Sequence, residues 1–129
     1  MVGFVGLVRR LLRRLHRLAF PLPEAFRGRD EIQIAEIKRE RYPRIPLTDE
    51  EFALVWREIA AVFFVPPELM RPEDRFFHEL PERASLAGSD EDIVLDEVLK
   101  RLETRFAIDR IVDAKCVGDI LTAIGRKRR

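Results

Sequence analysis

The 129-residue sequence has little of the chemistry on which several common protein classes depend. Its one cysteine, Cys116, excludes an intrachain disulfide and a cysteine-rich zinc site. The two histidines, His16 and His78, lie far apart in sequence and have no second histidine at ligand spacing. The spacing of the acidic residues does not single out two carboxylates as the catalytic pair of a glycosidase. We therefore expect no metal site and no catalytic site, and the cysteine usage favours a cytoplasmic protein.

The sequence has almost no net charge, but its separate parts are strongly charged. The total is +1, yet residues 1–29 carry seven Arg against one Glu, and residues 30–124 carry 13 Lys or Arg against 22 Asp or Glu. The last five residues add four positive charges. Since 47% of the residues are hydrophobic, the chain can build a core. The sequence therefore predicts an acidic body with basic ends.

Residues 1–20 contain no acid and no proline, and their pattern predicts a basic amphipathic helix. At 100° per residue, the apolar side chains fall in one sector of roughly 160°. The opposite side holds Arg9, Arg10, Arg13, Arg14 and Arg17. Such a helix can lie on an anionic membrane surface, pack against the acidic body or another copy of the chain, or bind nucleic acid. The acidic body opposes binding to phosphate, so nucleic acid is the partner that we least expect.

Residues 21–47 are predicted to be a linker with a possible short helix. Pro21, Pro23 and Gly28 break the helical pattern after residue 20. A short helix is expected over residues 31–42, and Pro43 should end it because proline fixes φ and removes a backbone donor.

Residues 48–125 are predicted to form a small helical bundle, so the expected fold class is all-α. Thr48 and Glu51 have the spacing of a capping box, and the helix that follows carries an apolar stripe that includes Trp56. A long loop with an aromatic anchor, Phe76-Phe77, leads to a second amphipathic helix. A last short helix should end at Gly125, and residues 126–129 would then be a basic tail.

The order of these elements resembles that of acyl carrier proteins over residues 48–124. The segment from Val65-Pro66-Pro67-Glu68 to Phe76-Phe77-His78-Glu79-Leu80 resembles the first loop of that family. Cys116-Val117-Gly118-Asp119-Ile120 looks like the Thr-Val-Gly-Asp sequence that starts its last helix. The resemblance implies a small up-and-down bundle, here preceded by the amphipathic helix of residues 1–20.

The same resemblance identifies the position where a prosthetic group would attach. In acyl carrier proteins, an Asp-Ser-Leu serine at the start of the second helix carries a 4′-phosphopantetheine arm. Counted back without gaps from Phe106, that position holds Asp92, and a carboxylate cannot be the hydroxyl nucleophile of the transfer. The chain is closest to acyl-carrier-like domains of unknown function that lack this serine. Ser89 is the alternative attachment point, or else the N-cap of the second helix.

The resemblance also implies a partner. Acyl carrier proteins dock the acidic face of the second helix onto basic patches of enzymes, and this face here comprises Asp92, Asp96, Glu97 and Glu103. We therefore expect a non-enzymatic interaction domain without a cofactor, whose partner is a basic-surfaced protein such as a lipid- or acyl-processing enzyme. Two alternatives remain open: a functional acyl carrier protein modified at Ser89, and a peripheral membrane protein that acts through residues 1–20.

Overall fold

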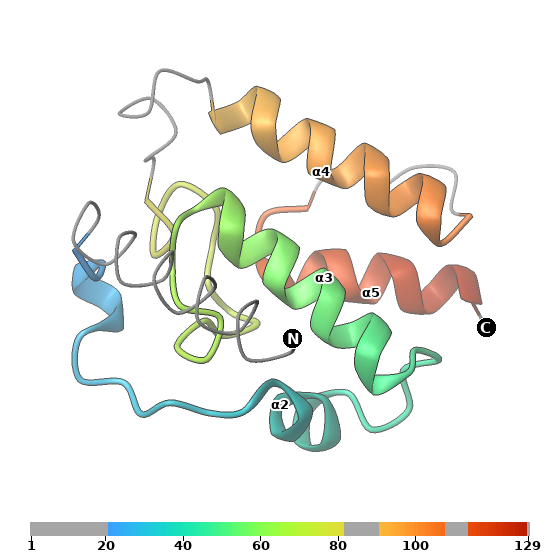
Figure 1. The fold of residues 1–129 in the computed structure, drawn as a ribbon, viewed down its shortest axis with the longest axis horizontal. Coiled ribbons are helices and arrows are strands. Elements are labelled where there is room, and N and C mark those ends of the chain that lie inside the picture. The colour runs from blue at the N-terminus through green and yellow to red at the C-terminus, as the bar shows by residue number, and fades with distance from the viewer. Residues whose placement is uncertain (1–20, 82–90, 108–113, 129) are drawn as a thin grey trace, which may run out of the picture.

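The computed structural model describes residues 21–81, 91–107 and 114–128 (Figure 1). These residues form a short 3-10 helix and four α-helices: η1 (Glu24–Phe26), α2 (Ile34–Arg41), α3 (Asp49–Val62), α4 (Glu91–Arg105) and α5 (Val117–Arg128). Within the described ranges, the only strand-like pairings are two isolated bridges. The all-α prediction is therefore confirmed for this part of the chain, and the predicted helix of residues 1–20 lies outside it.

Helix α3 is the centre of the fold, with α2 against one side of it and α4 against the other (Figure 1). It begins at the predicted capping box, in which the Glu51 N–H donates to the Thr48 hydroxyl at 3.1 Å and the Thr48 N–H donates to the Glu51 carboxylate at 3.0 Å. Trp56 is fully buried, as predicted, and its indole N–H donates to the Pro67 carbonyl at 2.7 Å. Satisfying that donor allows the large ring to lie in the core.

Helices α4 and α5 complete the core and run in the same general direction, opposite to α3 (Figure 1). Each contributes a buried row at helical spacing: Leu95, Val98 and Leu102 from α4, and Val117, Ile120, Leu121 and Ile124 from α5. The prediction that the last helix ends at Gly125 is wrong, because α5 continues to Arg128. A glycine inside a helix costs only about 1 kcal/mol, and no proline follows it to stop the helix.

The segment predicted as a linker is packed into the core. Its short helix, α2, lies within the range expected from the sequence. The side chains of Phe26, Ile34, Ile37 and Leu47 are all buried and belong to the same apolar cluster as the bundle. The Ile32 N–H also donates to the Glu68 carbonyl at 2.9 Å, which attaches the segment to the loop after α3. Residues 21–47 therefore form part of the folded body.

The long loop after α3 is fixed by its aromatic residues and by the start of α5. Phe76 stacks on Phe63 with ring centroids 5.6 Å apart, and Phe77 meets the same ring edge-on at 5.9 Å, so the predicted anchor is confirmed. The Val117 N–H donates to the Asp74 carbonyl at 3.1 Å, and the Gly118 N–H donates to the Pro72 carbonyl at 2.9 Å. Hydrogen bonds that α5 cannot form within its own first turn are thus supplied by the loop.

A buried ion pair joins this loop to the N-terminal segment. Asp74 is 1% exposed, and its carboxylate accepts two hydrogen bonds from the Arg29 guanidinium, at 2.7 and 2.8 Å, and one from the Arg71 N–H at 2.8 Å. The hydrogen bonds to Asp74 raise the pKa of Arg29 above its usual value. Because every one of these donors points at one carboxylate, the burial of its charge is compensated.

Removing the charge of Asp74 should destabilise the fold. In Asp74→Asn, the new amide group would place a donor against the guanidinium of Arg29, which would lose its buried counter-ion. We expect the free energy of unfolding to fall by about 3 kcal/mol, measured by urea denaturation.

Glu79→Gln is the matched control, since it also removes one carboxylate charge from an ion pair, here the exposed one with Arg75. It should lower the stability much less, because solvent screens exposed pairs. Equal losses in the two variants would contradict the role given to Asp74.

Candidate functional site

The outer face of α4 is the first candidate site, because it holds Asp96 and Glu97, two of the acidic residues singled out in the sequence. Asp96 and Glu97 are exposed, while the neighbouring Leu95 and Val98 turn into the core. Asp96 forms an ion pair with Lys100 at 2.9 Å, and this hydrogen bond raises the pKa of Lys100. Asp92 lies in the first turn of the helix.

Charge is divided along α4 rather than spread over one acidic face. Residues 91–97, which we call the acidic half of α4, contain four acids and no base, whereas residues 98–105 contain three bases and one acid. That acid, Glu103, is half-buried and raises the pKa of nearby Lys100. Arg101 lies 3.6 Å from the carboxylate of Glu58 on α3. An acidic docking surface is therefore limited to the first half of the helix, where acids also complement the helix dipole.

Several predicted site residues lie outside the part of the chain that the structure describes. These are Ser89, the alternative attachment point, and the five arginines of the N-terminal segment, Arg9, Arg10, Arg13, Arg14 and Arg17. Among the described residues, no group of three or more His, Cys, Asp and Glu side chains is arranged to hold a metal ion. None of the described helices is both long enough and apolar enough to cross a membrane.

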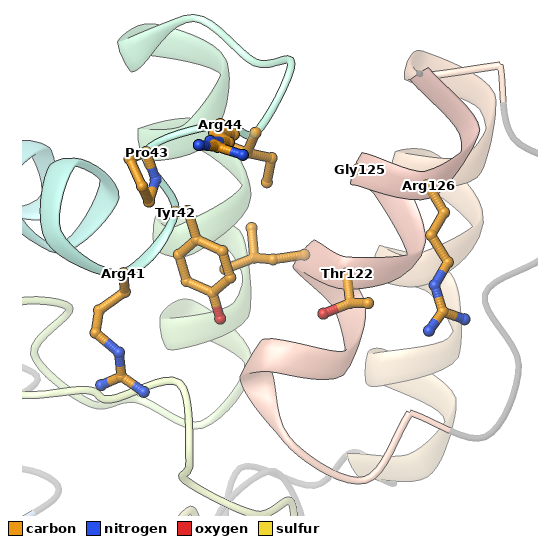
Figure 2. Close-up of a pocket in the computed structure, with 9 residues that line it drawn as sticks. Arg41, Tyr42, Pro43, Arg44, Thr122, Gly125 and Arg126 are labelled. Atoms are coloured by element: carbon orange, nitrogen blue, oxygen red, sulfur yellow. The ribbon is translucent and has the colours of Figure 1, made fainter.

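A second candidate site is a groove between the α2–α3 connection and α5, which we call the basic groove (Figure 2). It encloses about 290 Å³. Its positive charge comes from Arg41, Arg44 and Arg126, and none of its nine described lining residues is acidic. Arg41 forms an ion pair with Glu73, whereas Arg44 and Arg126 have no ion pair with any described residue.

Tyr42 connects the groove to the core. Its ring packs against Phe52 with centroids 5.7 Å apart, and its hydroxyl lies beside Gly118, where a Cβ atom would approach it to 3.1 Å. The absence of a side chain at Gly118 therefore allows the α2–α3 connection to sit close to α5. Burial of the Tyr42 side chain raises its pKa above 10.0, and the nearby Cys116 and Asp119 act in the same direction against the opposing effect of Arg41.

The sequence carried a weak signal for this groove. Arg41-Tyr42-Pro43-Arg44 is a compact basic and aromatic turn, and Arg126 begins the basic C-terminal run. The two stretches are about 80 residues apart, so nothing local indicates that they meet. The sequence predicts a helix end at Gly125 and therefore places Arg126 in a tail. In the structure α5 continues to Arg128, and this brings Arg126 to the groove.

Comparison of the chain with protein-family models, with curated proteins and with solved structures finds no match in any of the three.

Because Tyr42 is the only tyrosine, its titration can be followed directly by the ultraviolet absorbance of tyrosinate. We expect its midpoint in the folded protein to lie above 10.0, and to return to about 10 in concentrated urea. The folded chain then holds this proton more tightly than the unfolded chain. Its contribution to stability is complete below pH 10 and is lost as the pH rises through the folded pKa. Equal midpoints in the two states, with circular dichroism confirming the fold, would contradict the burial of Tyr42.

Proposed function

We propose that this protein is a non-enzymatic, acyl-carrier-like interaction domain that carries no 4′-phosphopantetheine arm and binds a basic-surfaced protein through the acidic half of α4. The observation that carries the proposal is the position of Asp92. It lies in the first turn of α4, where the resemblance to acyl carrier proteins expects the modified serine, and a carboxylate cannot accept the arm.

The arrangement of the described helices supports this proposal. The elements follow one another in the order that the resemblance implies. The capped helix α3 comes first, then the anchored loop, then α4 with its buried row, and last α5, which starts at the Val117-Gly118-Asp119 motif. The loop holds the start of α5 by the hydrogen bond from Gly118 to Pro72, at 2.9 Å. Helix α4 is held against α3 by its buried row, Leu95, Val98 and Leu102, which leaves Asp96 and Glu97 exposed for a partner.

Electrostatics supports the choice of partner. The exposed carboxylates of Asp96 and Glu97 lie in the first half of α4, and no basic residue occurs among residues 91–97. A positive patch on a partner would be attracted to this end and repelled by Lys100, Arg101 and Arg105 at the other end. Such a charge division favours one orientation of the helix over its reverse, which contributes to specificity and to the rate of association. By resemblance, the partner is a lipid- or acyl-processing enzyme.

The test is to incubate the full chain with coenzyme A and a broad-specificity phosphopantetheinyl transferase and to record the intact mass. The wild type should gain no mass. Asp92→Ser should gain one phosphopantetheine arm, because it restores a hydroxyl at the aligned position, and the matched control Asp92→Ala should gain none. An adduct on the wild type that disappears in Ser89→Ala would show instead a functional carrier protein.

The same assay tests the docking surface. In the Asp92→Ser background, Glu97→Lys should slow the modification by about tenfold, because the transferase must approach the acidic half of α4. Glu40→Lys, an identical charge change at an exposed position of α2, should leave the rate unchanged. Equal effects of the two substitutions, or no modification of Asp92→Ser at all, would contradict the proposal.

A further inference from the structure

The basic groove presents hydrogen-bond donors that the described part of the chain does not use. The hydroxyls of Tyr42 and Thr122 lie on facing sides of the groove (Figure 2), and neither forms a hydrogen bond with another described residue. Tyr42 is half-buried, so its hydroxyl has limited access to water. A polar group in such a position is stabilised by a partner that fills its hydrogen-bonding capacity.

Positive charge surrounds these hydroxyls. Arg41 and Arg126 flank them on either side, and Arg44 lies at the other end of the groove (Figure 2). Basic residues in the last turn of a helix complement the helix dipole, which accounts for Arg41 on α2 and Arg126 on α5. This explanation does not extend to Arg44, because it belongs to no helix and forms no ion pair with a described residue.

The floor of the groove is apolar. Leu121 is fully buried beneath it, and Ile45 lies 3.5 Å from where a Cβ atom of Gly125 would be. A Cβ atom there would be in van der Waals contact with Ile45, so Gly125 brings α5 close to the apolar wall of the groove. The volume of about 290 Å³ lies just below the range for drug-sized ligands, about 300–1,000 Å³, so the groove suits a smaller molecule. A small ligand with both an anionic and an apolar part fits this combination of floor and rim.

We propose that the basic groove binds a small organic phosphate monoester, with the phosphate between Arg126 and the Tyr42 and Thr122 hydroxyls and the organic group against Ile45. A phosphate monoester presents three acceptor oxygens and close to two negative charges, which match a rim that holds donors and cations but no acid among its described residues. The guanidinium of Arg126 can pair with two of these oxygens. The proposal is independent of α4 and of the proposed function.

Phenyl phosphate is the probe for this site, and the full chain is titrated while its ¹H–¹⁵N spectrum is recorded. Amide shifts should map to residues 41–45 and 121–126. Calorimetry should show that phenyl phosphate binds at least about tenfold more tightly than inorganic phosphate, which lacks the apolar group, and than benzyl alcohol, which lacks the charge. Shifts confined to the arginine-rich residues 1–20, or equal affinity for inorganic phosphate, would overturn the proposal.

Paired variants separate this groove from general charge attraction. Arg44→Gln/Arg126→Gln should weaken the binding of phenyl phosphate about tenfold, since it removes the two groove arginines that have no ion pair with a described residue. Arg57→Gln/Arg105→Gln is the matched control, because it removes two exposed arginines, one of them also in the last turn of a helix. All four positions are exposed, so the fold should be retained. Equal weakening by both double variants would overturn the proposal.

Discussion

The carboxylate of Asp74 is the point at which three segments of the chain meet. Its side chain holds Arg29 from the N-terminal segment and the backbone of Arg71 in its own loop, and its carbonyl accepts from Val117 at the start of α5. A buried charge is tolerated only where donors surround it, so this residue fixes the positions of all three segments together. The basic groove depends on that constraint, because α5, which begins at Val117, forms one of its walls.

The resulting molecule separates its charges in space. The acidic half of α4 lies on one side of α3 (Figure 1), whereas the arginines of the basic groove come from the end of α2, the connection after it and the last turn of α5. The ligands proposed for the two surfaces therefore differ in charge: a basic protein for the helix and an organic phosphate for the groove. The net charge of +1 gives no sign of either surface, because it is a sum over the whole chain.

The features predicted correctly from the sequence are those encoded by neighbouring residues. Thr48 and Glu51 are three positions apart, and Trp56 belongs to a stripe of helical period, so local patterns were sufficient. The pair between Arg29 and Asp74 spans 45 positions, and no local pattern indicates it. Phe26 lies in a stretch interrupted by Pro21, Pro23 and Gly28, which predicts a linker, so its burial could not be predicted from local pattern. Gly125 suggested a helix end, but packing against Ile45 accommodates it within α5.

The central claim is that residues 21–47 and the loop around Asp74 fold as one unit with the bundle. Native-state hydrogen exchange tests it most directly, through the amides of Ile32 and Val117, which donate to loop carbonyls at 2.9 and 3.1 Å. Both amides should be protected in the wild type, and Arg29→Gln should reduce their protection together while leaving Ile59 in α3 protected. Exchange of the Ile32 amide at the rate of an unfolded chain in the wild type would contradict the account.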